Sequence, residues 1–141
     1  MVFEEKTIES KRIYEGRIVN LRCDSVINVS GKLSPREIVE HVGGVALVVF
    51  TEDKKFVLEK QYRQAAGKVL IEVPAGKAER DEDPQVTAAR ELREETGYTA
   101  AKLEKLCAMY ASPGYCDEVL HVYLCTELAP GETDFDESEA I

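Results

Sequence analysis

No stretch of this sequence is long and apolar enough to cross a membrane. The longest apolar run covers residues 45–50, far short of the ~20 residues that a membrane-spanning helix needs. The first residues, Met-Val-Phe-Glu-Glu-Lys, are acidic where a secretion signal carries positive charge followed by a long apolar stretch. We therefore expect a protein that is neither exported nor bound to a membrane.

Cysteine pairs at metal-binding or redox spacing are also absent. The four cysteines, Cys23, Cys107, Cys116 and Cys125, lie far apart and include no C-x-x-C pair. This distribution predicts reduced thiols in a cytoplasmic protein.

Positive charge is scarce as well. The chain has 18 Lys and Arg against 27 Asp and Glu, which gives a formal net charge of −9. Nucleic-acid binding depends mainly on Lys and Arg that neutralise phosphates, so we expect no nucleic-acid partner. An acidic protein still binds anionic phosphates through bridging divalent cations, and that class of ligand stays open.

The chain's 141 residues suffice for one compact core, so a single domain over residues 1–141 is predicted. No internal repeat or low-complexity linker divides it. Short apolar or alternating runs bounded by turn residues predict strands at 18–29, 37–41, 45–50, 56–61, 69–73, 103–110 and 119–126. Many strands around one internal helix indicate a mixed sheet rather than a regular βαβ repeat.

One helix has both ends marked in the sequence. Asp83 suits the N-cap, Pro84 the first helical position and Gly97 the residue after the end, which predicts a helix over 84–96. The 3.6-residue period places three apolar side chains toward the sheet: Val86, Ala89 and Leu92.

The same helix carries a stripe of acidic side chains. Glu91 precedes Glu94 by three residues and Glu95 by four, so their carboxylates are neighbours that repel one another. Arg90 can pair with Glu94, which leaves oxygen ligands of the kind Mg²⁺ prefers. The alternative is an ordinary solvated helix surface. A glycine before the helix, Gly76, favours the site because it permits close approach of the backbone.

The residues from Gly76 to Tyr98 resemble the Nudix box, G-x₅-E-x₇-R-E-U-x-E-E-x-G-U. Every defined position of the box is filled, by the residues Gly76, Glu82, Arg90, Glu91, Leu92, Glu94, Glu95, Gly97 and Tyr98. The resemblance implies an α/β/α sandwich with a mixed sheet and a loop-helix-loop that binds Mg²⁺ or Mn²⁺ on the substrate's diphosphate.

The resemblance also implies roles for single residues. Glu91 and Glu95 look like metal ligands, together with the backbone carbonyl of Ala75. Glu94 looks like a ligand or a water-orienting group. Arg90 and Glu82 look like groups that support the ligands.

Segments outside the box resemble the ADP-ribose pyrophosphatase branch of this family. They are Arg36–His41, Gln61–Gln64, Glu72–Gly76 and Ser112–Gly114. Matching positions imply substrate contacts by Arg36, Glu37, Arg63 and Glu118, since arginine suits phosphate oxygens and stacks on adenine. The implied reaction is hydrolysis of ADP-ribose, a nucleoside diphosphate derivative, to AMP and ribose 5-phosphate. The alternative for these residues is that they are plain surface charges.

The general base is predicted near the C-terminus. The run from Asp136 to Glu139 resembles an acidic loop of relatives in which Glu137 would be the base and Glu139 a further metal contact. A solvated acidic tail explains the same run. Relatives continue past this loop into a strand and a helix, so we expect a truncated or minimal form ending at Ile141.

The branch resemblance further implies a homodimer. Residues 1–42 are expected to form an N-terminal antiparallel β region that dimerises, and residues 43–141 the catalytic core. An intramolecular sheet explains the same strand signals. Two other functions stay open: hydrolysis of another nucleotide sugar or a nucleoside triphosphate, and a Nudix-fold module that binds a nucleotide without cleaving it.

Overall fold

The computed structural model describes residues 3–135. Within this range the chain forms two compact units. The first comprises the chain up to Gly43 together with Tyr110–Val119, and the second comprises Gly44–Met109 together with the chain after Val119. Each unit has its own sheet.

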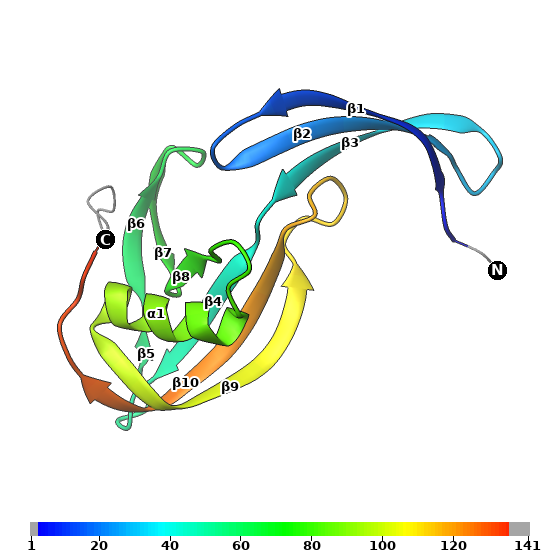
Figure 1. The fold of residues 1–141 in the computed structure, drawn as a ribbon. Coiled ribbons are helices and arrows are strands. Elements are labelled where there is room, and N and C mark those ends of the chain that lie inside the picture. The colour runs from blue at the N-terminus through cyan, green and yellow to red at the C-terminus, as the bar shows by residue number, and fades with distance from the viewer. Residues whose placement is uncertain (1–2, 136–141) are drawn as a thin grey trace. The chain divides into compact units, whose positions relative to one another are not determined.

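The first unit is built on a three-stranded antiparallel sheet, drawn in blue to cyan in Figure 1. Its strands are β1 (Lys6–Glu15), β2 (Val19–Ile27) and β3 (Leu33–His41), in the order β1-β2-β3. The loop Tyr110–Val119 pairs with β3, because Val39 N–H donates to the carbonyl of Tyr115 at 2.7 Å and the Val39 carbonyl accepts from Asp117 N–H at 3.1 Å. The branch-like Ser112-Pro113-Gly114 segment is thereby fixed to the N-terminal sheet.

The second unit contains a mixed sheet. Its strands are β4 (Gly44–Phe50), β5 (Phe56–Val57), β8 (Ala75–Lys77), β9 (Tyr98–Tyr110) and β10 (Val119–Pro130). The order is β5-β4-β10-β9, with β10 parallel to β4 and both β5 and β8 antiparallel to it. A separate antiparallel hairpin joins β6 (Glu59–Arg63) to β7 (Lys68–Glu72).

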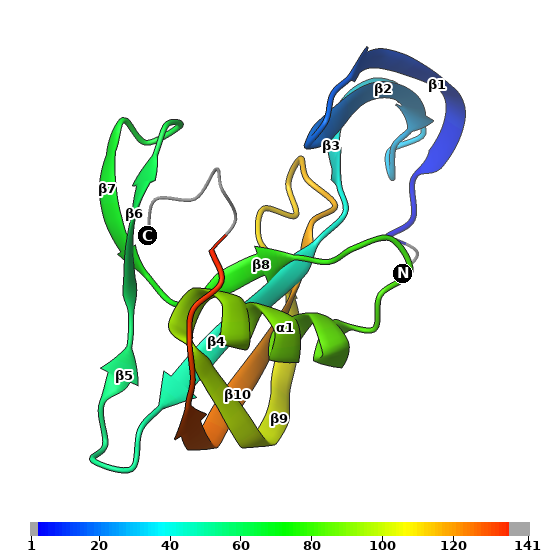
Figure 2. The same cartoon turned by 60° about the vertical axis from the view of Figure 1, so that its left-hand side comes forward.

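The single helix of residues 3–135, α1 (Pro84–Thr96), lies across one face of this sheet (Figure 2). Asp83 caps its start by accepting from Gln85 N–H at 2.8 Å, and Gly97 ends it in the left-handed conformation at φ 70°. Ala88 and Leu92 pack into a core with side chains of β4 and β10: Val45, Leu47, Val49, Tyr123 and Cys125. The core therefore fixes the helix directly over β4.

These observations confirm the α/β class, the mixed sheet and the helix bounds. The second helical layer of the predicted sandwich is not among the described residues. The predicted strand 56–61 is two separate strands, and the sequence analysis missed β1 and β8 altogether. The division of roles between residues 1–42 and 43–141, and the truncated or minimal form, stay predictions.

The inward face of the helix was predicted correctly at Leu92 and wrongly at Val86 and Ala89. Val86 is 57% exposed and Ala89 is also exposed, whereas Glu91 and Glu95 are buried on the side that carries Leu92. The apolar pattern misled because two of the inward positions are acidic. No helix within residues 3–135 has the length and apolar character that crossing a membrane requires.

Candidate active site

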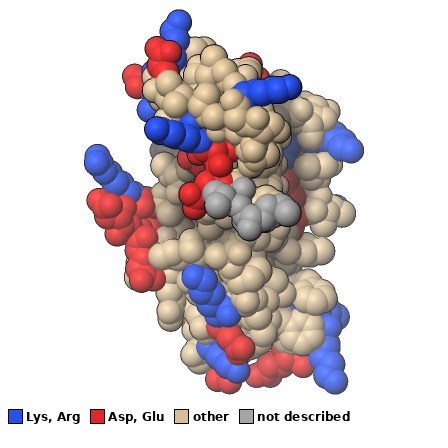
Figure 3. Space-filling view, turned by 90° about the vertical axis from the view of Figure 1, so that its right-hand side faces the viewer, with Lys and Arg blue, Asp and Glu red and all other residues tan. Residues whose placement is uncertain are grey.

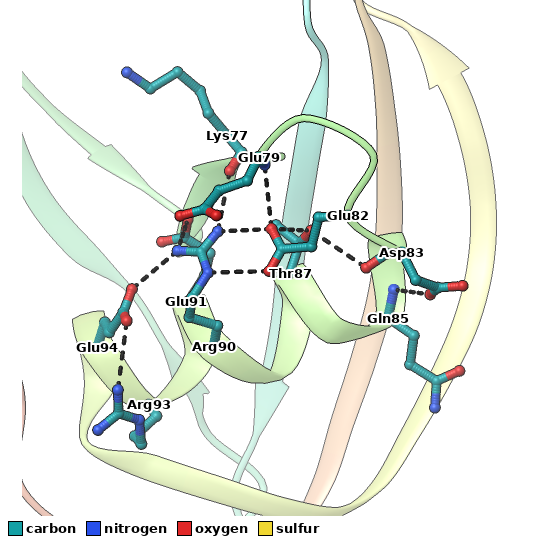
Figure 4. A network of polar contacts seen from close by, with 10 residues as sticks. All are labelled: Lys77, Glu79, Glu82, Asp83, Gln85, Thr87, Arg90, Glu91, Arg93 and Glu94. Atoms are coloured by element: carbon teal, nitrogen blue, oxygen red, sulfur yellow. Dashed lines mark hydrogen bonds and ion pairs between the residues drawn. The ribbon is translucent and has the colours of Figure 1, made fainter.

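Arg90 is the centre of a polar network on the second unit (Figure 4). Its Nη1 donates to Glu91 Oε1 at 2.8 Å and to Glu94 Oε2 at 3.0 Å. Its Nε and Nη2 donate to Glu82 at 3.3 and 3.1 Å. One guanidinium thus holds three carboxylates, which explains how the helix tolerates neighbouring acidic side chains.

Glu82 anchors this guanidinium from the loop before the helix. Besides Arg90, it accepts from Glu79 N–H at 3.1 Å and from the Thr87 hydroxyl at 2.9 Å. The Arg90 guanidinium, followed by the Glu79 N–H, lowers the pKa of the Glu82 carboxyl to about 2. The same pairing raises the pKa of Arg90 above its ordinary value. Both groups are therefore charged throughout the neutral range, and the pair holds the Glu91 and Glu94 carboxylates through Arg90 Nη1.

Glu91 and Glu95 are the buried acidic pair, at 8% and 7% exposure. They are four residues apart and so share one side of α1. Glu91 lies directly over Gly76: a Cβ placed on that glycine would come within 1.8 Å of Glu91 Cδ. Glu95 Oε2 accepts from Ala75 N–H at 2.9 Å. The turn into β8 therefore brings the Ala75–Gly76 backbone against both carboxylates.

This donor set fits a hard divalent cation. Within residues 3–135, no three His, Cys, Asp or Glu side chains already form a group that could hold a metal ion. Mg²⁺ does not need such a cage, because it keeps several waters and binds through one or two carboxylates plus substrate phosphates. Glu91 and Glu95, beside a backbone that leaves no room for a side chain at Gly76, supply that minimum.

Glu94 lies at the edge of the network. Its Oε2 is held by Arg90, and its Oε1 lies 3.4 Å from Arg93 Nη2. The backbone N–H of Asp134 donates to its carbonyl oxygen at 2.9 Å, so the chain after β10 passes the end of α1. Glu137 and Glu139, the predicted base and further metal contact, lie outside the described residues.

Arg63 is held on the β6–β7 hairpin of the same unit. Its Nε and Nη2 donate to the Glu72 carboxylate at 2.9 and 2.8 Å, a two-pronged pairing. This pairing raises the pKa of Arg63, with smaller contributions from the charges of Glu59 and Glu95. The arginine is therefore a fixed cation under the electrostatic influence of a predicted metal ligand.

Arg36 and Glu37 belong to the first unit. They line a groove of about 550 Å³ that also includes Tyr110, Pro113 and Tyr115. Arg36 Nε donates to Glu5 Oε2 at 2.9 Å. The structure thus brings two predicted substrate residues and the Ser112–Gly114 loop to one groove of this unit.

Glu118 lies at the end of the same loop. Its Oε1 is 3.2 Å from His41 Nδ1, and the neighbouring Asp117 accepts from His41 N–H at 2.9 Å. Glu118 is therefore half-buried beside the end of β3 rather than a free loop residue. Sequence reasoning missed this partner, because His41 is 77 positions away and nothing local links the two.

Charge of both signs is present on the face of the molecule that Figure 3 draws. On the face drawn in Figure 3, lysines and arginines are scattered among acidic and uncharged residues and form no continuous basic surface. This fits a protein whose anionic ligand meets a few fixed arginines, such as Arg63, rather than a broad cationic surface.

Two residues of the site were not predicted. Glu72 holds Arg63, and Thr87 holds Glu82. Glu72 lies in the Glu-Val-Pro-Ala-Gly segment that was singled out for its resemblance, but no role was assigned to it. Thr87 precedes Glu91 by four residues, so the helical period puts both side chains on the same side of α1. That spacing was the signal in the sequence that could have identified Thr87.

Comparison with known proteins agrees with this geometry. A family model described as the NUDIX domain matches residues 40–141, and one described as the nucleoside diphosphate sugar hydrolase N-terminal domain matches residues 5–39. An ADP-ribose pyrophosphatase of Bacillus subtilis (strain 168) is 46% identical over 140 residues, which cover 98% of this chain and 76% of the relative.

Two further proteins are similar over almost the whole chain. A methanol dehydrogenase activator of Bacillus methanolicus is 45% identical over 142 residues, covering 99% of this chain and 77% of that one. The crystal structure of an ADP compounds hydrolase matches with a TM-score of 0.84 at 20% identity, over 96% of this chain and 74% of the other. At that identity the structural match shows the fold alone.

Proposed function

This chain belongs to the Nudix hydrolase family, and we propose that it hydrolyses ADP-ribose with the aid of Mg²⁺. The family acts on diphosphate bonds, so water adds across the P–O–P link and the products are AMP and ribose 5-phosphate. The observation that carries the proposal is the burial of Glu91 and Glu95 against the Ala75–Gly76 backbone. The choice of ADP-ribose rests on similarity to an ADP-ribose pyrophosphatase over 98% of this chain.

The metal would be held by Glu91, Glu95 and the backbone carbonyl of Ala75, with Glu139 as a further contact. When bound, Mg²⁺ neutralises diphosphate charge and makes a bound water more acidic. Arg90 keeps the Glu91 carboxylate oriented, and Glu82 keeps Arg90 oriented. Mn²⁺ prefers the same oxygen ligands and is the natural substitute.

The substrate would be bound by Arg63, Arg36, Glu37 and Glu118. Arg63 is already oriented by Glu72, and it uses only part of its five N–H donors in that pairing, so others remain for phosphate oxygens. The groove beside Arg36 offers the tyrosines Tyr110 and Tyr115, which suit a planar base. Glu94 would bind the metal or orient the attacking water, and Glu137 would accept the proton of that water.

Two alternative functions are distinguished from ADP-ribose hydrolysis by what happens to the bound nucleotide. The same carboxylates serve a hydrolase of another nucleotide sugar or of a nucleoside triphosphate, and the products distinguish these substrates. A nucleotide-binding module without catalysis would bind ADP-ribose and leave it intact.

We also propose a homodimer in the cytoplasm. The N-terminal sheet carries exposed large apolar side chains, namely Ile8, Ile13, Tyr14 and Leu33. A second copy would remove them from water. The four cysteines are free thiols, which suits a reducing compartment. Light scattering coupled to size-exclusion chromatography measures the oligomeric state.

The test is product analysis after incubation with ADP-ribose and Mg²⁺. The parent is expected to release AMP and ribose 5-phosphate, and Glu91→Gln is expected to lose this activity while keeping its fold. Glu104→Gln, at a half-exposed glutamate of β9 paired with Lys102, is the matched control and should retain activity. Full activity in Glu91→Gln would contradict the site, whereas binding without turnover by the parent would favour the non-catalytic module.

A further inference from the structure

Thr87 is a polar residue buried completely within the helix face that packs on the sheet, with 0% of its surface exposed. Its hydroxyl has two acceptors within reach: Glu82 Oε2 at 2.9 Å and the Asp83 carbonyl at 3.3 Å. A hydroxyl has one proton to donate, and a carboxylate is the stronger acceptor. The proton therefore goes to Glu82, and the longer contact to the backbone is secondary.

The Glu82 carboxylate in turn holds Arg90, because its Oε1 accepts from Arg90 Nε and its Oε2 accepts from Arg90 Nη2. Three donors converge on its Oε2: Arg90 Nη2, Glu79 N–H and the Thr87 hydroxyl. One donor belongs to the loop backbone, and the other two belong to side chains of α1. Thr87 is the fully buried one of these two helix residues, so its hydroxyl ties Glu82 to the inward face of the element that also carries the acidic stripe (Figure 4).

Arg90 transmits this orientation to the acidic stripe. The nitrogen that faces away from Glu82, Nη1, donates to both Glu91 and Glu94. A guanidinium is planar and rigid, so its position at the Glu82 end sets where its other end lies. A loosened Glu82 would therefore loosen the contacts at Glu91 and Glu94.

We propose that Thr87 is a positioning residue of the active site, acting through Glu82 on Arg90 and thereby on Glu91 and Glu94. It is not a catalytic residue, because it lies one carboxylate and one guanidinium away from the acidic stripe. Its catalytic consequence rests on the proposed function, but its effect on Arg90 does not. The helix thus orients its own acidic stripe from a buried residue one turn earlier.

The direct test follows the Arg90 Nε–H in nuclear magnetic resonance spectra, assigned by its loss in Arg90→Lys. Thr87→Val keeps the shape and removes the hydroxyl, and we expect the Nε–H to exchange with water about ten-fold faster, since a hydrogen bond to a charged group is lost. Thr87→Ser keeps the hydroxyl and should exchange as the parent does. Thr96→Val is the matched control, because Thr96 donates to the Leu92 carbonyl within the same helix and touches none of the network. If Thr87→Val does not fold, Thr87→Ala also removes the hydroxyl, and the same Nε–H exchange rate is measured in that variant.

The kinetic readout separates this inference from the proposed function. We expect Thr87→Val to lower kcat/KM for ADP-ribose about ten-fold, with Thr87→Ser and Thr96→Val close to the parent. If Nε–H exchange is faster in Thr87→Val but the parent does not hydrolyse ADP-ribose, the positioning role of Thr87 is supported and the proposal that ADP-ribose is the substrate is refuted. Unchanged exchange and unchanged kcat/KM in Thr87→Val, with only a lower Tm, would overturn the inference and leave Thr87 a plain packing residue.

Discussion

Gly76→Ala is the substitution that most sharply separates the fold from the active site. A methyl group at this position would lie 1.8 Å from Glu91 Cδ and 2.1 Å from its Oε1. The atoms in the way belong to the end of a flexible side chain, so the Glu91 carboxylate must move while the backbone keeps its place. The φ angle of Gly76 is not in the left-handed region that penalises alanine.

The cost to stability should be small. Driving Glu91 away from a favoured rotamer costs about 0.5–1.5 kcal/mol. The loss of backbone freedom in the unfolded chain stabilises alanine over glycine by about 0.4–1 kcal/mol. These two effects nearly cancel, so we expect a change in the free energy of unfolding of about 1 kcal/mol or less, measured by urea denaturation.

The cost to activity should be large. Moving a metal-binding carboxylate by about 1 Å lowers the rate by roughly a hundred-fold. Release of AMP from ADP-ribose at saturating Mg²⁺ measures this loss. Gly31→Asn is the control, because Gly31 lies in the β2–β3 turn at φ 77° with open space around it, and asparagine tolerates that conformation. A folded Gly76→Ala protein with parental activity would refute the reasoning, since Glu91 would then not act from the position it occupies.

Three further perturbations test the network and the helix face. Arg90→Met removes the shared guanidinium, and we expect a loss of about 1–3 kcal/mol in the free energy of unfolding by urea denaturation, together with loss of activity; parental stability would contradict the network. The pKa of Glu82 in the folded protein lies near 2, below its ordinary value near 4.5. Its stabilising effect is therefore complete above pH 4.5 and disappears as the pH falls toward 2. The difference in free energy of unfolding between the parent and Glu82→Gln should shrink over that window, and a difference that grew on acidification would refute the assignment. Leu92→Ala should destabilise by about 2–5 kcal/mol because Leu92 is buried in the core, whereas Val86→Ala should change stability by about 0.5 kcal/mol or less; equal effects would mean that the helix packs through the predicted face.

The helix and the acidic stripe were predictable because their signals are local. Asp83 and Gly97 mark the ends through capping chemistry that needs no information from the rest of the chain, and the structure has the helix at the predicted residues. The spacing of the box fixes which residues neighbour one another along the helix. The pairing of Arg90 with Glu94 followed from the four-residue spacing alone.

What the sequence did not predict depends on distant partners. The strand β1 is exposed at every residue and lacks an apolar alternation, so it forms through its pairing with β2 rather than through its own pattern. The strand β8 has three residues, too few to show an alternating pattern, and it forms through its antiparallel pairing with β4. The contact between Glu118 and His41 likewise joins residues that are distant in the chain.

The wrong positions on the helix face have a different origin, because two inward positions of α1 carry glutamates where the pattern rule expects apolar residues. A helix packed on a sheet for stability alone would place apolar side chains at each inward position, yet α1 places Glu91 and Glu95 beside Leu92. Charged side chains lose hydration when buried, and apolar residues of similar volume are often as stable or more so. Arg90 and the Ala75 N–H partly offset this cost for Glu91 and Glu95. Two buried glutamates against Gly76 are still an unusual choice for stability alone, and they agree with the proposed cation site. The conflict between the helical apolar period and the observed burial therefore falls on the residues proposed to bind the cation, and Thr87 is a third buried polar residue of the same helix.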